Sequence, residues 1–211
     1  MSRCFGDGDP LYEGYHDTEW GRPRTSERDL YEKVCLEGFQ AGLSWITVLR
    51  KRDALREAFL GFEPDAVAGL DVAPLLTDVR LIRSRAKLQA CVTNARATVA
   101  LRATGGLPAL IWSYREQSPA PTDWSQVPAS TPASASLAKT LKRAGFSFVG
   151  PTTVYSLLQA CGPINDHLAG CPVRPAVEAD RAAVRRPPGA GDLDDLVAPT
   201  GVSSTTPSRS A

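Results

Sequence analysis

The chain has 211 residues, of which 43% are hydrophobic and 22% charged, and its formal net charge is +1. These values are typical of a soluble globular protein with a full core. No apolar run is long enough to cross a bilayer, and the N-terminal MSRCFGDGDP lacks the apolar core of a signal peptide, so we expect a cytoplasmic protein without a membrane partner. Five cysteines without a secretory signal argue against a disulfide framework and leave metal binding open.

The charges are segregated along the chain. Residues 1–37 contain nine acidic and five basic residues, whereas residues 79–102 contain six basic residues and no acidic one. Lys139, Lys142 and Arg143 form a second basic group. Such local positive charge can contact the phosphates of a polyanion, or it can be the solvated face of a helix. Charge alone leaves both alternatives open.

The hydrophobic pattern of the first half is helical, and no convincing run alternates as a strand does. Ser26 is expected to cap a helix that continues through Leu36, and Ser44 a second helix with its apolar side at residues 48–59. Pro64 lies at a first-turn position of a short helix that ends near Gly69. This half of the chain therefore predicts three helices.

The second half continues in the same way. Apolar residues at 88–99 trace one face of a longer helix that stops at Gly105-Gly106, and residues 107–116 form another. Residues 117–136 are a Pro/Ser/Ala-rich connection, whose end at Thr131-Pro132 starts a helix that runs to Gly145. Pro151 opens the next helix, through Gly162. The sequence therefore predicts an all-α fold.

The composition changes after Cys171. The remaining residues are poor in large apolar side chains and rich in Pro, Gly, Ser and Thr. We expect residues 1–172 to form the folded domain and residues 173–211 to be a disordered tail, with a helical turn near residues 177–185.

The only two histidines of the chain each have a cysteine nearby, Cys4 and His16 at one end and His167 and Cys171 at the other. Two thiolates and two imidazoles form a complete ligand set for tetrahedral zinc, and such a site is structural because no position remains for water. It would pin the N-terminal arm to the last helical segment. The spacing matches no standard zinc finger, however, and on spacing alone it favours four unrelated residues.

Residues 137–161 contain two helices joined by a short, glycine-containing link. In a helix–hairpin–helix motif the backbone N–H groups of the link and of the second helix's first turn bind one phosphate, and Lys142 and Arg143 would assist. An ordinary packed pair of helices fits the local pattern equally well.

Four stretches resemble the bacterial 3-methyladenine DNA glycosylase I family, within the helix–hairpin–helix glycosylases. They are RCFGDGDPLYEGYHDTEWG (3–21), CLEGFQAGLSWITVLRKR (35–52), LIRSRAKLQACVTNARA (81–97) and GFSFVGPTTVYSLLQACGPINDHLAGC (145–171). The resemblance implies a helix–hairpin–helix DNA glycosylase fold whose N- and C-terminal segments are tethered by one structural Zn²⁺. The zinc ligands would be Cys4, His16, His167 and Cys171.

The resemblance also implies roles for the remaining site residues. Glu37, a single carboxylate in the apolar run CLEGFQAGLSW, would be the base-recognition residue and the candidate catalytic group. The residues that would bind the base are Tyr12, Tyr15, Trp20, Trp45 and Ser156. The residues expected to contact DNA, from the resemblance or from the hairpin, are Gly42, Leu43, Lys142, Arg143 and Gly150.

The implied activity is hydrolysis of the N-glycosidic bond, which releases 3-methyladenine from alkylated double-stranded DNA after base flipping. Thr152 stands where many superfamily members have a lysine nucleophile, so no strand-cleaving lyase activity is expected. Asn165 stands where the superfamily has an aspartate, and Asp166, one residue on, is the alternative. The hairpin keeps only the second glycine of the usual Gly-x-Gly, with Phe148 in place of the first.

We expect a monomer. Three other interpretations remain open: a non-catalytic, zinc-stabilised DNA-binding protein, a zinc-stabilised helical protein without a DNA role, and a glycosylase of shifted specificity, for example towards 3-methylguanine. A base-release assay and a salt-dependent DNA-binding titration separate these alternatives.

Overall fold

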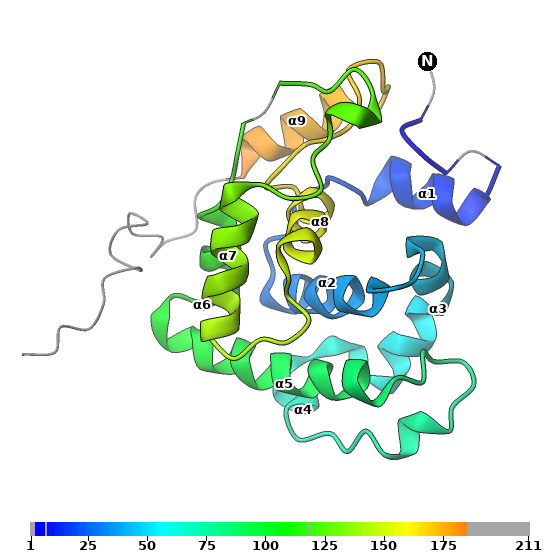
Figure 1. The fold of residues 1–211 in the computed structure, drawn as a ribbon, viewed down its shortest axis with the longest axis vertical. Helices are drawn as coiled ribbons and strands as arrows, with labels where there is room; N and C mark the ends of the chain where they lie inside the picture. Colours follow the sequence, from blue (N-terminus) through cyan, green and yellow to red (C-terminus); the bar gives the residue numbers. More distant parts are fainter. Residues whose placement is uncertain (1–2, 7, 118, 185–211) are drawn as a thin grey trace, which may run out of the picture.

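The computed structural model describes residues 3–6, 8–117 and 119–184. Over these residues the protein is entirely helical and contains no strand, which confirms the all-α prediction (Figure 1). Four short 3-10 helices supplement the α-helices, at Leu60–Phe62, Pro74–Leu76, Arg102–Thr104 and Trp124–Gln126. The α-helices are α1 (Pro10–Thr18), α2 (Glu27–Gln40), α3 (Trp45–Ala58), α4 (Pro64–Val67), α5 (Arg85–Leu101), α6 (Gly106–Trp112), α7 (Pro132–Arg143), α8 (Pro151–Cys161) and α9 (Arg174–Ala183).

Helix α2 runs through the centre of the molecule (Figure 1). It contacts α3, α5, α6 and α8, and every residue from Leu30 to Phe39 is buried. The Ser26 side chain accepts a hydrogen bond from the Asp29 amide at 3.1 Å, which satisfies one of the free donors at the helix start, as expected. A helix buried on all sides has no solvent-facing stripe, so each polar residue on it needs a partner inside the protein.

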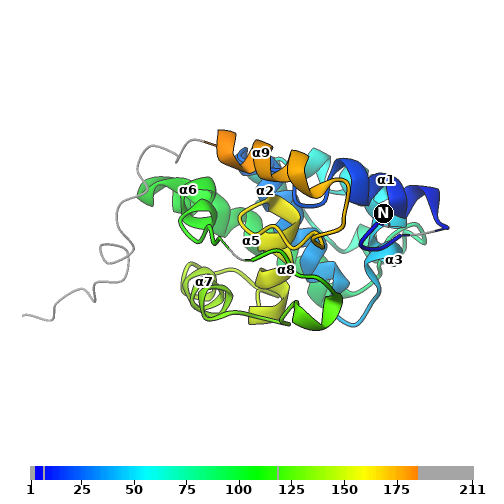
Figure 2. The same ribbon diagram turned by 90° about the horizontal axis from the view of Figure 1, so that it is seen from above.

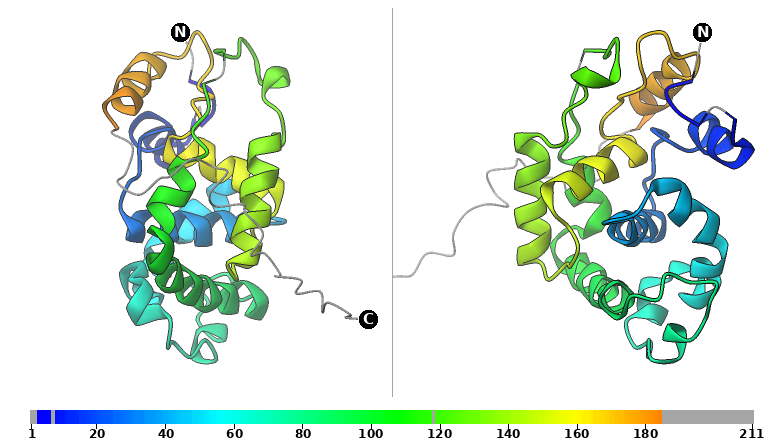
Figure 3. Two further views of the ribbon diagram at one scale, coloured as in Figure 1. Left: turned by 90° about the vertical axis from the view of Figure 1, so that its left-hand side faces the viewer. Right: turned by 45° about the vertical axis from the view of Figure 1, so that its right-hand side comes forward.

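The other helices are arranged around α2. Figure 3 shows α4 and α5 at the end of the molecule that is remote from α1 and α9. Helices α7 and α8 lie side by side, and α8 packs against α2. Helices α1 and α9 lie along the same side (Figure 2), where Arg22 forms an ion pair with Asp180 of α9. No described helix is long and apolar enough to cross a membrane.

Two helices depart from the sequence-based expectation. Helix α1 is not predicted by the hydrophobic pattern, although Asp9 caps it by accepting from the amides of Leu11 and Tyr12. In the tail expected from residue 173, the helical turn expected near residues 177–185 is a longer helix, α9, which starts at Arg174, has ten residues and buries Val177 and Arg181. The Arg181 guanidinium donates to the carbonyl groups of Gly162, Pro163 and Glu116, which ties α9 to the rest of the domain. Residues 185–211 of the expected tail lie outside the described residues.

Candidate active site and metal centre

Glu37 lies near the C-terminal end of α2 and lines a cavity of about 220 Å³. Only 4% of the residue is exposed, and burial raises the pKa of its carboxyl group, an effect that the ion pair with Lys33 partly offsets. The cavity lies between the end of α2 and the beginning of α8, and it is small for a ligand site, which suits a single ring system. Its other lining residues are Gln40, Ala41, Gly42, Thr152, Thr153 and Ser156.

Two of the aromatic residues expected around a base, Tyr15 and Trp45, contact Lys33 beside Glu37, and their rings touch each other. The Tyr15 and Trp45 rings are both buried, with centroids 5.2 Å apart and planes inclined by 44°. A third ring between two parallel rings requires about 7 Å, twice the usual contact distance. In this arrangement a base can stack only on an outer face of the pair. Tyr12 shares the same surroundings, because burial and the charge of Glu37 raise the pKa of its hydroxyl group.

Lys33 is a site residue that sequence reasoning missed. Its Nζ lies 3.3 Å from Oε1 of Glu37, donates to the Tyr15 hydroxyl at 3.1 Å and lies 4.1 Å from the centroid of the Trp45 ring. Burial alone lowers the pKa of Lys33, but Tyr15 and Glu37 outweigh it and the pKa is raised. Lysine and glutamate four residues apart share one helix face, and this spacing was the available signal.

Trp20 lies beside the Cys/His cluster. Its ring centroid is 4.5 Å from that of His167 and 5.0 Å from that of Phe5. None of the four expected aromatic residues, Trp20 included, is among the residues that line the Glu37 cavity. Trp20 therefore packs against the Cys/His cluster. Its role in base binding stays a prediction.

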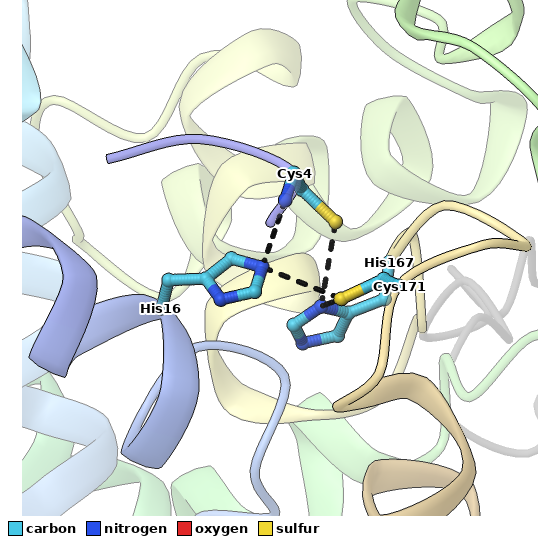
Figure 4. Close-up of side chains that lie close together, drawn as sticks. All are labelled: Cys4, His16, His167 and Cys171. Carbon is cyan, nitrogen blue, oxygen red and sulfur yellow. Dashed lines mark hydrogen bonds between the residues drawn. The ribbon is translucent and has the colours of Figure 1, made fainter. Parts of the chain in front are cut away.

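The four residues Cys4, His16, His167 and Cys171 converge from both ends of the described chain (Figure 4). All four are buried, and their ligand atoms lie within 4.8 Å of one another. The Sγ-to-nitrogen distances are 3.4 Å for Cys171 with His167 and 3.6 Å for both Cys4 with His167 and Cys171 with His16. Zinc bond lengths in a tetrahedron give about 3.5 Å for such pairs. The donor set and its spacing therefore fit a metal ion of tetrahedral preference.

Hydrogen bonds around the cluster orient the two imidazoles for coordination. His16 Nδ1 donates to Asp17 at 2.8 Å, which leaves Nε2 unprotonated. In this structure Nε2 accepts from the Cys4 amide, and on metal binding its lone pair would go to the ion instead. His167 Nε2 donates to the Trp20 carbonyl at 3.0 Å, which leaves Nδ1 unprotonated and facing the thiols. Burial lowers the pKa of His167 to about 4, so the ring is neutral at pH 7. Such partners of ligand histidines fix the tautomer and the ring orientation.

Helices α7 and α8 form a hairpin with the glycine-containing link that the sequence predicts. Gly145, at φ +95°, ends α7, and the amides of Gly145 and Phe146 donate back to the carbonyl groups of Lys142 and Leu141. Phe148 has a φ of +57°, the left-handed region that favours glycine, and it packs directly on Gly38 of α2. A Cβ on residue 38 would lie 3.2 Å from the Phe148 Cβ. The link between α7 and α8 therefore packs on α2 at the residue that follows Glu37.

The start of α8 presents a row of free donors. Within the described part of the chain, no acceptor meets the amides of Gly150, Thr152 or Thr153. Lys142 and Arg143, at the end of α7, are exposed. A helix N-terminus with free amides and nearby cations can bind an anion such as phosphate.

The cationic run at residues 79–102 is mostly engaged inside the protein. Arg80 pairs with Asp78 and Glu57, and Arg102 with Glu27 and Asp65. Lys87 and Arg96 donate to backbone carbonyl groups. Four of the six cations of this run therefore have partners within the protein.

Comparison with known proteins gives the family. The model of the methyladenine glycosylase family matches residues 5–175. The chain belongs to this family. It is 48% identical to DNA-3-methyladenine glycosylase 1 of Escherichia coli (strain K12), with 81% of this chain and 96% of that protein aligned. A crystal structure of 3-methyladenine DNA glycosylase I has 47% identity and a TM-score of 0.79, covering 82% of this chain and all of that one. A tyrosine-to-phenylalanine variant of 3-methyladenine DNA glycosylase I in complex with 3-methyladenine has 37% identity and a TM-score of 0.78, covering 83% and 98%.

Three further positions of this methyladenine glycosylase family member, Thr152, Asn165 and Asp166, were compared in the sequence analysis with functional residues of the superfamily. Thr152, in place of the superfamily's lysine, lines the Glu37 cavity. Asn165 donates to Glu178, whereas Asp166 accepts from Tyr155 at 2.6 Å and from Gln159 at 2.8 Å. Neither Asn165 nor Asp166 is among the residues that line the cavity. The remaining expected contact, Leu43, is exposed in the link between α2 and α3, next to Gly42.

Proposed function

We propose that the chain is a monofunctional DNA-3-methyladenine glycosylase of base-excision repair. The observation that carries the proposal is the buried Glu37 carboxylate, at a cavity bordered by the free amides of α8 and next to an aromatic pair. Known relatives of this family are named for 3-methyladenine, and one has been solved with that base bound. The substrate is alkylated double-stranded DNA.

Recognition in this proposal depends on the charge of the damaged base. Methylation at N3 makes adenine a cation, and an outer face of Trp45 or Tyr15 attracts a cation with about 1–2 kcal/mol when water is excluded. Glu37 accepts a hydrogen bond from the exocyclic amine, and its charge favours a cationic ring over neutral adenine. The indole Nε1 of Trp45 is buried without an acceptor among the described residues, which supports a site completed by a ligand.

The reaction is a hydrolysis. Water adds to the sugar C1′, the C1′–N9 bond breaks, and its electron pair neutralises the departing ring, while the proton of the water passes to solvent. The cationic base is a good leaving group without protonation, so no general acid is needed. In this mechanism Glu37 is chiefly a recognition residue, and the rate comes from activated substrate held in orientation.

The proposed enzyme lacks lyase activity. A lyase needs a neutral amine to form a Schiff base, and the hairpin offers Thr152 instead of lysine. Lys33 does not replace it, because its raised pKa keeps the amine protonated and paired with Glu37.

The proposed resident metal is one structural Zn²⁺, held by Cys4, His16, His167 and Cys171. When bound it supplies the positive charge that keeps both thiols ionised, since burial otherwise raises the pKa of Cys4 to about 12. The four protein ligands leave no position for water, so the ion serves the fold and not the reaction.

The proposed DNA contacts are sequence-independent. The free amides of Gly150, Thr152 and Thr153 would hold a backbone phosphate as a helix–hairpin–helix motif does, with Lys142 and Arg143 beside it. Gly42 and Leu43 would approach the gap that the flipped nucleotide leaves. We propose that the protein acts as a monomer in the cytoplasm.

Release of 3-methyladenine from methylated DNA tests the proposal, with the released base identified by mass spectrometry. Glu37→Gln is expected to weaken base binding and to slow single-turnover excision at saturating enzyme by a modest factor. Glu32→Gln is the matched control, because Glu32 is an equally buried glutamate of α2 that pairs with Arg56. A loss of many orders of magnitude in Glu37→Gln with base binding intact would make Glu37 a general base. No released base from the native protein would favour the non-catalytic DNA-binding alternative.

A further inference from the structure

Lys33 is a buried cation that the proposed reaction does not use. Its side chain is 10% exposed, and its ammonium group contacts three of the site residues, Glu37, Tyr15 and Trp45. A buried lysine is costly unless its charge is compensated, so this placement requires the carboxylate of Glu37 beside it. The same argument applies in reverse to Glu37. Among the described residues, no other group donates to Glu37 or forms an ion pair with it.

The contacts of Lys33 decide what its neighbours can offer to a ligand. An ammonium group only donates hydrogen bonds, so the Tyr15 oxygen accepts from Lys33 and the Tyr15 proton is left to donate elsewhere. Lys33 lies near one oxygen of Glu37, at 3.3 Å, and the other oxygen remains to accept from a ligand. The pair therefore presents one acceptor, from Glu37, and one donor, from Tyr15.

We propose that Lys33 is a positioning residue that keeps Glu37 ionised and directs the Tyr15 hydroxyl group as a donor. The pocket is thereby set for a base edge that carries a hydrogen-bond donor beside an acceptor. The part of this inference that concerns the base rests on the proposed function. The part that concerns the ionisation of Glu37 does not.

Lys33 is the cation that stabilises the ionised form of Glu37. Besides Lys33 on its own helix, the titratable groups that face the pair are Tyr12 and Tyr15 of α1 and Cys161 of α8. None of these is a cation. Glu19 also interacts with Lys33, but it forms its own ion pairs with Arg52 and Arg24. Burial disfavours the Glu37 carboxylate, and within the described residues Lys33 alone opposes that effect.

Lys33 also changes how the site treats a cationic base. Its ammonium group already lies over one face of the Trp45 ring, at 4.1 Å from the centroid. That face of Trp45 is therefore not open to a cationic base. The Lys33–Glu37 pair is neutral in sum, so the affinity for a cation comes from the free Glu37 oxygen and from the aromatic face, and not from a net negative pocket.

The test is a titration of Glu37 itself in the free protein. Glutamate labelled with ¹³C at the carboxyl carbon is followed by NMR across the pH range, and the Glu37 signal is assigned by its absence in Glu37→Gln. Lys33→Met removes the charge with little change of shape, and its expected effect is a rise in the pKa of Glu37 by about 1–3 units. Lys33→Arg is expected to restore most of the native value.

Lys51→Met is the matched control, because Lys51 donates to the carbonyl groups of Val79 and Arg80 and does not contact the pocket. It should leave the titration of Glu37 unchanged. An unchanged pKa of Glu37 in a folded Lys33→Met protein would overturn the proposal. Should Lys33→Met not fold, the ¹⁵N shift of Lys33 Nζ in the native protein gives the answer. That chemical shift must change over the pH range in which Glu37 titrates. A ¹⁵N titration curve that does not change in that range would also overturn the proposal.

The titration needs neither DNA nor turnover, so its outcome is separate from the fate of the proposed function. In the base-release assay, the proposal predicts that Lys33→Met moves the acid side of the pH–rate profile to higher pH. A purely structural lysine would lower the rate at all pH values without moving the profile.

Discussion

The buried side chain of Asn94 on α5 holds the backbone of Ser147 in the link between α7 and α8. Its Nδ2 donates to the Ser147 carbonyl at 3.2 Å, and its Oδ1 accepts from the Ser147 amide at 2.7 Å. The two residues are 53 positions apart in the sequence. This pairing fixes the link one residue before Phe148, and hence the start of α8, against the helix that packs on α2.

Asn94→Ala is expected to loosen the hairpin. It leaves two backbone groups of Ser147 without their partner, which should cost about 1–3 kcal/mol of unfolding free energy. We expect the affinity for undamaged duplex DNA to fall about tenfold, equal to about 1.4 kcal/mol. Fluorescence anisotropy and thermal denaturation measure the two effects. Asn94→Asp keeps the acceptor but sets a buried carboxylate oxygen against the Ser147 carbonyl, so it should destabilise the protein at least as much as Asn94→Ala. Unchanged DNA affinity in a destabilised Asn94→Ala protein would separate the hairpin from DNA binding.

The salt dependence of DNA binding should distinguish the exposed cations of α7 from the paired ones of the 79–102 run. Lys142→Ala is expected to lower the slope of log affinity against log salt by about 1, the loss of one phosphate contact. Arg102→Ala is the control, because Arg102 is committed to Glu27 and Asp65. It should leave the slope as it is. Equal slopes for Lys142→Ala and the native protein would place the phosphate contacts elsewhere.

Removal of the metal is expected to destabilise the whole domain. Cys171→Ser should reduce the zinc content from about one to near zero, measured by mass spectrometry of the metal. The midpoint of thermal unfolding should fall by about 10 °C, since each kcal/mol shifts a domain of this size by about 2–4 °C. Cys35→Ala is the matched control, because Cys35 is equally buried but lies outside the cluster. A Cys171→Ser protein that keeps full zinc would contradict the proposed ligand set.

The rate of base excision should depend on pH through Glu37. Burial raises the pKa of this carboxyl group, so the acid side of the profile is expected above the usual range of a glutamate, about 4.3. Below its pKa Glu37 is neutral and loses its attraction for a cationic base, so the rate falls as the pH falls. Single-turnover rates at saturating enzyme measure this. In the Glu37→Gln protein the rate should not fall on the acid side of the profile. A fall that persists there would be due to another titratable group.

The sequence predicts most of the helices because their signals are local. Ser26, Pro64 and Pro151 mark helix starts, and the structure begins α2, α4 and α8 at or beside them. Helix α1 was not predicted because its residues PLYEGYHDT contain no apolar stripe. The only local signal for it is the N-cap Asp9 followed by Pro10. Helix α9 was expected only as a helical turn near residues 177–185, because its apolar content is low and its two buried side chains, Val177 and Arg181, give no apolar stripe.

Some residues of the candidate site were predicted from the sequence and others were not. Glu37, Gly42 and Ser156 were expected from the resemblance, and the structure brings all three to one cavity. Lys33 and Asn94 were missed because a lysine or an asparagine on a helix usually faces water. Their roles depend on burial and on partners from other helices, which no local pattern contains. The mutual contact of Tyr15 and Trp45 is likewise a property of packing alone.

The Cys/His cluster has a consequence for how the protein is made. Its ligands come from positions 4, 16, 167 and 171, so the site cannot exist on a ribosome until nearly the whole domain has been synthesised. Until then the N-terminal arm, which carries Tyr12 and Tyr15, has nothing to close against at the cluster. A metal ion could therefore be held by all four residues only after residue 171 has been synthesised, and a chain truncated before residue 167 lacks two of the four.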